Sequence, residues 1–554
     1  MLAMPRPRVQ NPARMLTILQ TARNGVARPA FMALALGAVA ACGFQPLAIW
    51  PLTILAVAGL IACTARARGT GHAFLIGWAF GLAHFSVGNN WIATAFTYQA
   101  NMPTWLGGVA VVLLSVYLAV YPALATAGAW LLVHRLGGSA RGWPFGIALA
   151  ALWIVTEWLR AWIFTGFAWN PLGVALLGPY DAQGLALLLP WTGTYALSGV
   201  LVVIAELLRQ AVLSLTGGDR RRRLALLMAA SASAAGLGAL MILPARYLEP
   251  TEGAIRYTLV QPDIRQEFIN DARFYERNFW KVARLSRPEK EGERRVVLWP
   301  ESGIPDYLRE GYPPHLYRQF TFAGDPAVAR ERIGRVVGPY ALVMSGVVDL
   351  VMRNGDDIAA RNTVTAIDWR GNIVASYSKA HLVPYGEYLA LRWLLEPLGA
   401  TRLVPGALDF WAGPGPLTYD LGEYGRVAVQ ICYEIIFSGQ VVDPEHRPDY
   451  IFNPSNDGWF GSWGPPQHLA QARLRAIEEG LPVLRATTTG ISAVIDANGI
   501  VRHHIPRHRE GRIDGRIPPP HAPTLFARIG NALPLAWAVL LLMGSTVALR
   551  RRKR

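Results

Sequence analysis

The feature that most constrains this chain is a series of eight apolar stretches, each long enough to cross a lipid bilayer as a helix. A membrane-spanning helix needs about 20 mainly apolar residues. Only 16% of the residues are charged, well below the roughly 25% of soluble domains, so a purely soluble protein is excluded. We predict spans at 29–47, 49–65, 72–96, 105–133, 143–165, 193–215, 224–243 and 525–548. The sequence thus predicts a polytopic α-helical membrane protein of about eight spans.

The net charge of +16 would ordinarily suggest nucleic-acid binding, but its position along the chain argues against that. The segment 256–516 is close to neutral, and the excess of Arg and Lys lies in short clusters between and beyond the spans. Basic residues occupy every second connection, so the positive-inside rule places both termini in the cytoplasm. We therefore predict a basic cytoplasmic segment at 1–28, a basic cytoplasmic tail at 549–554 and no nucleic-acid partner. No short apolar region with a small-residue cleavage site follows residue 28, so we predict an uncleaved first span.

A mostly polar segment, 250–518, separates the seven spans within 29–243 from the eighth span, and the same charge pattern places it outside the cytoplasm. It alternates β-like runs with amphipathic stretches, which indicates an α/β layered domain. The β-like runs are 255–260, 296–299, 341–348, 363–367, 373–377, 427–431, 450–452 and 491–495, and the helix-like stretches are 271–285, 326–336 and 467–479.

Three chemically useful side chains follow apolar strands in this segment. Cys432 follows 427–431, Glu301 follows 296–299, and Lys379 follows 373–377. A thiol is mostly protonated at neutral pH, so a nucleophilic cysteine needs a base or a cation nearby. Each of these residues alone is more often an inert cysteine or a surface charge than a catalytic group.

Together they resemble the Glu-Lys-Cys triad of the nitrilase superfamily, and with the spans the chain resembles its membrane-embedded branch, the apolipoprotein N-acyltransferases. The resemblance covers nearly the whole chain from about residue 30. It rests on the motifs Trp299-Pro300-Glu301, Tyr377-Ser378-Lys379, Pro384-Tyr385-Gly386-Glu387, Ile431-Cys432-Tyr433-Glu434, Asn453-Pro454-Ser455-Asn456-Asp457, Trp459-Phe460 and Gly43-Phe44-Gln45-Pro46.

This resemblance implies a nitrilase-like αββα sandwich inserted between the seventh and eighth spans, in a bacterial inner membrane, with the catalytic domain in the periplasm. It implies that Cys432 accepts an acyl chain from a membrane phospholipid, with Glu301 as general base, and passes it to the N-terminal amine of a diacylglyceryl apolipoprotein. Lys379 and the amide of Tyr433 would stabilise the oxyanion. It further implies support from Glu387 and Glu434, and substrate binding by Trp459, Phe460 and Asn453. No metal or other cofactor is expected.

Some alternatives stay open at this stage. A membrane-tethered hydrolase would use the same triad with water as the acceptor, although eight spans argue against a soluble substrate. Trp459 and Phe460 are equally consistent with core aromatics. Glu157 and Arg160, three residues apart in the fifth predicted span, favour an ion pair within one helix. The family commonly has a Trp near Phe268, which is a candidate substitute.

Overall fold

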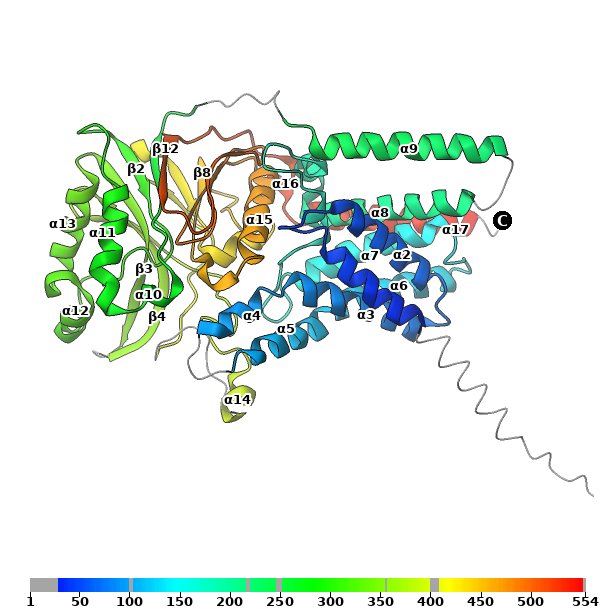
Figure 1. The fold of residues 1–554 in the computed structure, drawn as a ribbon, viewed down its shortest axis with the longest axis horizontal. Helices are drawn as coiled ribbons and strands as arrows, with labels where there is room; N and C mark the ends of the chain where they lie inside the picture. Colours follow the sequence, from blue (N-terminus) through cyan, green and yellow to red (C-terminus); the bar gives the residue numbers. More distant parts are fainter. Residues whose placement is uncertain are drawn as a thin grey trace, which may run out of the picture.

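The computed structural model of the protein describes residues 28–98, 103–215, 220–245, 252–353, 356–398 and 408–551. The predicted segment 1–28, apart from its last residue, and the last three residues of the predicted tail 549–554 lie outside these ranges. The described residues form a bundle of apolar helices with an α/β sandwich at one end (Figure 1).

The helical part is built from nine longer helices among the described residues, with short helices where the chain reaches the sandwich. The longer ones are Arg28–Ala41, α2 (Trp50–Thr64), α3 (Thr70–Gly88), α5 (Trp105–Leu118), α6 (Val120–Arg135), α7 (Trp143–Arg160), α8 (Leu189–Leu215), α9 (Arg220–Ile242) and α17 (Ala532–Arg551). The short ones include α4 (Ile92–Ala95), η1 (Phe96–Tyr98) and α16 (Leu525–Ile529).

Four stretches of the described chain are long and apolar enough to cross a membrane: Trp105–Arg135, Leu185–Leu215, Arg223–Ile242 and Ala532–Arg551. The first unites α5 and α6 and agrees with the single span predicted at 105–133. The helices Arg28–Ala41 and α2 are shorter; at 1.5 Å per residue they are only about 21–23 Å long. The number eight therefore stays a prediction.

Four predicted spans are longer than the helices that form. The span predicted at 72–96 ends as α3 at Gly88, and the span predicted at 143–165 ends as α7 at Arg160. The span predicted at 29–47 ends as a helix at Ala41, because the residues up to Leu47 form turns. The span predicted at 525–548 is divided into α16 and α17 by Gly530, whose φ of +62° is incompatible with a continuous right-handed helix. The hydrophobicity of a segment predicts that it can lie in a membrane, but it does not predict where the helix ends or is interrupted.

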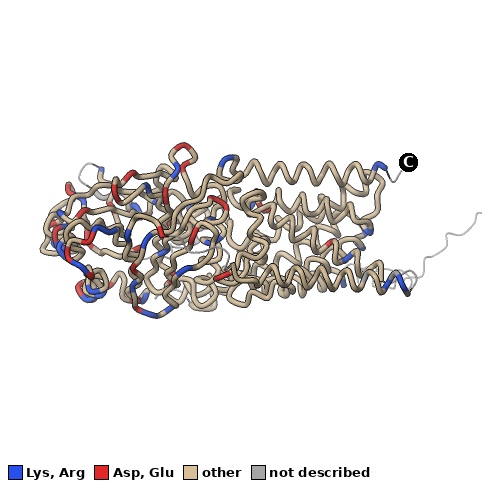
Figure 2. Tube along the Cα trace, turned by 90° about the horizontal axis from the view of Figure 1, so that it is seen from above, with Lys and Arg blue, Asp and Glu red and all other residues tan. Residues whose placement is uncertain are grey.

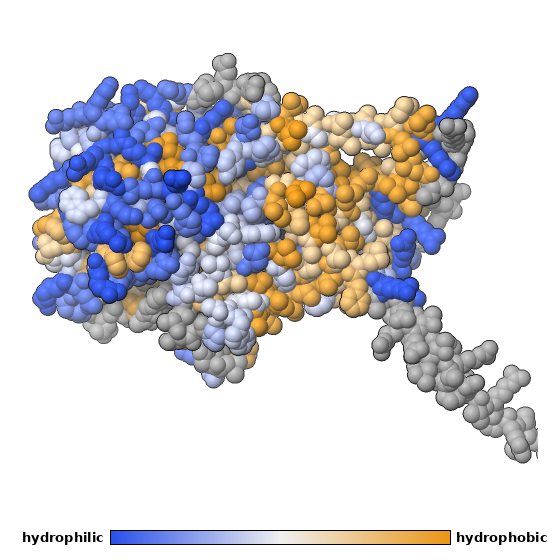
Figure 3. All heavy atoms as spheres, viewed as in Figure 1, coloured by the Kyte–Doolittle hydropathy of each residue, from blue (hydrophilic) through white to orange (hydrophobic). Residues whose placement is uncertain are grey.

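The two parts of the fold differ in the polarity of their outer surfaces. Figure 3 shows a hydrophobic surface over the helices and a hydrophilic surface over the sandwich. Charged residues are concentrated in the sandwich, and Lys and Arg appear again at the far end of the helices (Figure 2). This distribution fits a helical part surrounded by lipid, with a large polar domain on one side of it.

The sandwich consists of two six-stranded sheets. The first has the order β12-β1-β2-β3-β4-β5 and the second β11-β10-β9-β8-β7-β6. The first-sheet strands are β1 (Arg256–Gln261), β2 (Arg295–Leu298), β3 (Ala341–Arg353), β4 (Asp356–Asp368), β5 (Ile373–Ser378) and β12 (Gly511–Arg516); the second-sheet strands are β6 (Thr418–Asp420), β7 (Arg426–Val429), β8 (Tyr450–Ser455), β9 (Val483–Thr487), β10 (Ser492–Ile495) and β11 (Val501–Ile505). In each sheet the central strands pair in parallel and the outer strands antiparallel.

Helices cover both outer faces of the sandwich. On the side away from the bundle lie α11 (Tyr275–Leu285), α12 (Pro314–Phe320) and α13 (Pro326–Val337), and α15 (Gly464–Glu479) lies between the sandwich and the bundle (Figure 1). Every residue of α15 except Pro466 is buried, polar and charged ones included. The other helices of the sandwich have one apolar face, but α15 is covered on all sides.

The strand and helix predictions for the sandwich are confirmed. All eight predicted β-like runs overlap strands, and the three helix-like stretches overlap α11, α13 and α15. The αββα layering implied by the resemblance is also present. The strands β6, β9, β11 and β12 were not predicted.

One hydrophobic core joins the two parts of the molecule. Trp91 and Trp169 from the helical part pack in the same buried cluster as Cys432, Tyr433 and Phe460 from the sandwich. The strand ends that carry the predicted chemistry therefore lie next to the apolar helices.

Candidate active site

Cys432 lies where the second sheet meets the helical part. It lies three residues after the end of β7 and begins the 3-10 helix η8 (Cys432–Ile436). Its φ is +50°, a left-handed conformation that few residues other than glycine adopt. The chain thus turns sharply at the thiol, and the first amides of η8 have no acceptor within the helix. The Cys432 side chain is buried and its thiol is free.

Glu301 comes from the first sheet, three residues after β2, and is also buried. Each of its carboxylate oxygens accepts a hydrogen bond. The amide Nδ2 of Asn362 donates to Oε1 at 2.6 Å, and the backbone N–H of Asn456 donates to Oε2 at 2.8 Å. These bonds fix the orientation of the carboxylate between the two sheets.

Lys379 directly follows β5 and is almost fully buried. Its Nζ lies 3.0 Å from a carboxylate oxygen of Glu387 and 3.8 Å from Oε1 of Glu301. Burial lowers the pKa of Lys379, but Glu387 and Glu301 raise it, and the net result is a pKa above the ordinary value. Lys379 is therefore an ammonium ion at neutral pH.

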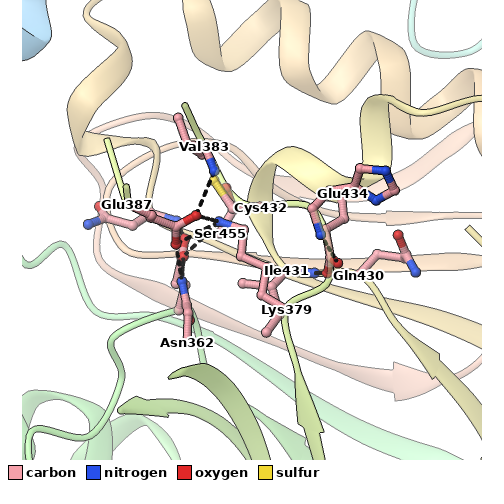
Figure 4. Close-up of polar contacts among 12 residues, drawn as sticks. Asn362, Lys379, Val383, Glu387, Gln430, Ile431, Cys432, Glu434 and Ser455 are labelled. Atoms are coloured by element: carbon pink, nitrogen blue, oxygen red, sulfur yellow. Dashed lines mark hydrogen bonds and ion pairs between the residues drawn. The ribbon is translucent and has the colours of Figure 1, made fainter. Parts of the chain in front are cut away.

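Asn362 connects the two carboxylates. Its Nδ2 donates to Oε1 of Glu301 and, at 2.8 Å, to Oε1 of Glu387 (Figure 4). The other oxygen of Glu387 accepts from the backbone N–H of Val383 at 2.8 Å. Both carboxylates are consequently held beside the Lys379 ammonium.

The surroundings of Cys432 keep its thiol protonated. Burial raises the pKa of Cys432 above its ordinary value, the negative charge of Glu301 raises it further, and Lys379 lowers it in part. The thiol therefore needs a base at the moment of attack. Glu301, which acts on the Cys432 thiol by its charge, is a suitable group.

Glu434 links the segment that carries Cys432 to the segment that carries Lys379. Its Oε1 accepts hydrogen bonds from the Tyr377 hydroxyl at 2.8 Å, the Ala380 N–H at 2.7 Å and the His381 N–H at 3.2 Å. Its Oε2 accepts from the Ile431 N–H at 2.7 Å. Glu434 therefore connects the loop after β5 to the loop after β7 by hydrogen bonds. The supporting role predicted for Glu434 would act through these contacts.

We expect Glu434 to make stability depend on pH. Burial raises the pKa of Glu434 to about 7, whereas an unfolded glutamate has a pKa of about 4.3. The folded state therefore binds a proton more tightly, and this contribution to stability is complete below pH 4 and is lost as the pH rises through 7. Thermal unfolding of the wild type and Glu434→Gln between pH 5 and pH 8 measures it.

The difference in melting temperature between the wild type and Glu434→Gln should change across this range, with the wild type losing stability relative to the variant as the pH rises. A constant difference would show that Glu434 does not titrate there. Glu445→Gln is a suitable control, because Glu445 is an exposed glutamate of the same domain.

The remaining residues predicted to support catalysis or to bind substrate lie in different surroundings. The Tyr433 hydroxyl donates to the carbonyl of Gly166 at 3.1 Å, so this residue ties the site to the helical part. Phe460 is buried against Trp91, at 4.8 Å between ring centroids, whereas Trp459 is half-buried against Tyr98.

Asn453 is fully buried. Its Nδ2 donates to the carbonyl of Gln430 at 2.6 Å, and its Oδ1 accepts from Arg485. These contacts connect neighbouring strands of the second sheet, so they indicate a structural role for Asn453. Substrate binding by Asn453, Trp459 and Phe460 stays a prediction. Phe268, the candidate substitute for a Trp, packs on Phe274 at 4.7 Å.

The predicted ion pair between Glu157 and Arg160 is wrong. Among the ion pairs of the described residues none joins these two side chains. Glu157 Oε1 instead accepts from the Leu172 N–H at 2.8 Å, and Arg160 donates to the carbonyl of Trp169 at 2.9 Å. Each side chain thus has one hydrogen bond to the backbone after α7, because that segment folds back onto the helix.

Three residues at the site were not singled out from the sequence. Asn362 lies within β4, and its only signal is a polar residue before the apolar run 363–367. Asn456 belongs to a motif that was noted, but its role comes from a backbone N–H, which sequence does not display. His468 contacts the carbonyl of Cys432 at 2.9 Å from α15, 36 residues further along the chain.

Comparison with known proteins gives consistent matches over both parts. Residues 36–207 match the family described as apolipoprotein N-acyltransferase N-terminal domain, and residues 259–522 match the carbon-nitrogen hydrolase family. The chain is 34% identical to an apolipoprotein N-acyltransferase of Rhodopseudomonas palustris, over 94% of this chain and 95% of that protein. It is 30% identical to one of Nitrosomonas europaea, over 94% and 98% of the two chains. Among solved structures, a CN-hydrolase superfamily protein of Xanthomonas campestris is 20% identical, covering 48% of this chain and 90% of that one, with a TM-score of 0.32.

Proposed function

This chain belongs to the apolipoprotein N-acyltransferase family, and from that premise we propose that it moves an acyl chain from a membrane phospholipid to the N-terminal amine of a diacylglyceryl apolipoprotein. The observation that carries the proposal is the meeting of Glu301, Lys379 and Cys432, from strand ends of two sheets, beside apolar helices. Such a site can serve two lipid substrates that never leave the bilayer. We further propose that the protein lies in the bacterial inner membrane with its sandwich in the periplasm.

In the first half-reaction, Glu301 takes the proton of the Cys432 thiol, and the thiolate attacks the ester carbonyl of the phospholipid. The oxyanion of the tetrahedral intermediate is stabilised by the Lys379 ammonium and by the amide of Tyr433 at the start of η8. The intermediate collapses when the C–O bond breaks. The lysophospholipid oxygen takes the proton from Glu301 and leaves, and the acyl chain remains on Cys432 as a thioester.

In the second half-reaction, the α-amine of the apolipoprotein attacks the thioester carbonyl. Glu301 accepts a proton from the attacking nitrogen, the C–S bond breaks, and the thiolate regains its proton. The products are an amide and the free enzyme. Because one site holds the two substrates in turn, the cycle is of the ping-pong type.

The test uses the purified protein with vesicles of a phospholipid labelled in its acyl chains and a synthetic diacylated lipopeptide with a free α-amine. We expect the Cys432 peptide to gain one acyl mass before the lipopeptide is added, and the lipopeptide to gain it afterwards. Release of labelled fatty acid without amide formation would instead favour the hydrolase that shares this triad.

We expect Glu301→Gln to lower the rate of thioester formation by about 10²–10⁴-fold, because a general base contributes roughly that much. The side chain keeps its shape but cannot take the proton of Cys432. Mass spectrometry of the Cys432 peptide after timed exposure to the labelled phospholipid measures the rate. An unchanged rate would exclude Glu301 as the base. Glu267→Gln, a change in an exposed carboxylate, is the control.

A further inference from the structure

The backbone at Cys432 requires support that the catalytic residues themselves do not give. A left-handed conformation at a residue other than glycine is unfavourable and persists only where surrounding contacts enforce it. The carbonyl of Cys432 has such a contact, because His468 Nε2 lies 2.9 Å from it. His468 is completely buried in α15.

The neighbours of His468 select its protonation state. Nη2 of Arg485 lies 3.0 Å from Nδ1, and Oδ1 of Asp457 lies 3.1 Å from the same atom. Arg485 Nη2 also binds both oxygens of Asp457 at 2.7 Å, so the Asp457 charge is already matched. Since burial and then Arg485 lower the pKa of His468, the ring is neutral. Arg485 donates to Nδ1, and Nε2 carries the hydrogen that is donated to Cys432.

Other residues of α15 hold the same loop further along. Arg475 donates to the carbonyl of Ile436 at 3.1 Å, and the Ser438 hydroxyl donates to Glu478 at 2.9 Å. Gln467, immediately before the histidine, contacts the helical part of the molecule: its Nε2 donates to the carbonyl of Gln45 and to the carbonyl of Gly88, the last residue of α3. The helix that supports the Cys432 turn is thus itself anchored in the bundle.

We propose that His468 is a positioning residue for the Cys432 nucleophile: its Nε2–H holds the Cys432 carbonyl and thereby fixes the backbone turn that aims the thiol. This inference rests on the proposed function of Cys432. A histidine that only fills the core would need no donor at this position, and any side chain of similar size and polarity would replace it.

Two substitutions separate these roles. An asparagine at 468 places its amide near the position of Nδ1, within reach of Arg485 but not of the Cys432 carbonyl. A glutamine places its amide nitrogen near the position of Nε2 and can donate to that carbonyl. The matched control is Gln471→Ala, because Gln471 is a buried neighbour on α15 whose side-chain nitrogen has no partner among the described residues.

The measurement is the rate of thioester formation on Cys432 with vesicles of labelled phospholipid, per mole of folded protein. We expect His468→Asn to lower the rate at saturating phospholipid by about 10²-fold, as for a misplacement of about 1 Å. The half-saturating phospholipid concentration should change by less than about threefold, and His468→Gln should restore the rate to within about tenfold of the wild type. Gln471→Ala should lower only the melting temperature.

Equal rates in His468→Asn and the wild type would overturn the inference, as would equal losses in His468→Asn and His468→Gln. If the wild type forms no thioester, the proposed function fails, and alkylation of Cys432 by iodoacetamide gives a separate answer on His468. His468→Asn should then change the Cys432 alkylation rate at least about tenfold, with recovery in His468→Gln. The Cys42 peptide in the same sample is the internal reference, and an unchanged ratio of the two peptides overturns the inference.

Discussion

Replacing Cys432 by alanine is expected to abolish the acyl-enzyme and to lower acyl transfer by on the order of 10⁴-fold or more, as removal of a covalent nucleophile does. The fold should persist, because the change removes one buried sulfur atom, which costs about 1 kcal/mol. The loss should therefore appear in the reaction and not in the amount of folded protein.

The experiment combines mass spectrometry of the protein after exposure to labelled phospholipid with thermal unfolding of the same sample. Cys63→Ala is the matched control, since Cys63 is also a free and buried thiol but lies in α2 of the bundle. It should retain the acyl mass. Substantial transfer by Cys432→Ala would reject the thioester route altogether.

Replacing Lys379 by methionine is expected to be nearly as damaging, and in two distinct ways. The change removes the charged donor to the oxyanion, which typically costs 10²–10³-fold in rate. It also leaves Glu301 and Glu387 buried without their cation, while Asn362 still holds them close together. The loss of the oxyanion donor and of the cation beside the base should together lower the rate by more than about 10³-fold.

The second effect should also appear in stability. Removing one partner of a buried ion pair typically costs about 3–5 kcal/mol, and denaturant unfolding in detergent would measure it. Adding Glu387→Gln to Lys379→Met leaves one buried carboxylate without the cation in place of two, so the double variant should regain part of the stability but none of the activity. Lys281→Met is the control, because Lys281 donates only to backbone carbonyls. An equal loss of stability in the single and double variants would contradict the electrostatic explanation.

The sandwich was largely predictable because its central strands are apolar and its chemistry lies at strand ends. The ends of β2, β5 and β7 are visible as sequence boundaries, and they locate Glu301, Lys379 and Cys432. By contrast, β12 reads Gly-Arg-Ile-Asp-Gly-Arg and becomes a strand only because it pairs with β1, about 255 residues earlier in the chain. A strand that forms only because it pairs with a neighbouring strand need not show the apolar or alternating sequence from which strands are predicted.

The surroundings of the site were much less predictable, for a related reason. Asn362, Asn456 and His468 act through contacts between elements that are distant in the sequence, and two of these contacts involve backbone atoms. Spacing along one helix also misled the prediction for Glu157, because its partner is a loop amide that the ion-pair rule does not consider. Residue type and spacing locate the reacting groups, whereas the fold determines what holds them.

The cluster of Lys379, Glu301 and Glu387 has two carboxylates for one ammonium. In the proposed cycle, acidic side chains thus outnumber cationic ones around the acyl group. This balance disfavours retention of a departing lysophospholipid, which would bear a phosphate. It favours the approach of an α-amine, whose ordinary pKa of about 7.7–8.0 makes it largely cationic at neutral pH; the amine gives up that proton to solvent before it attacks, which leaves Glu301 available as the base. The acidic excess would thus favour exchange of the anionic product for the cationic acceptor.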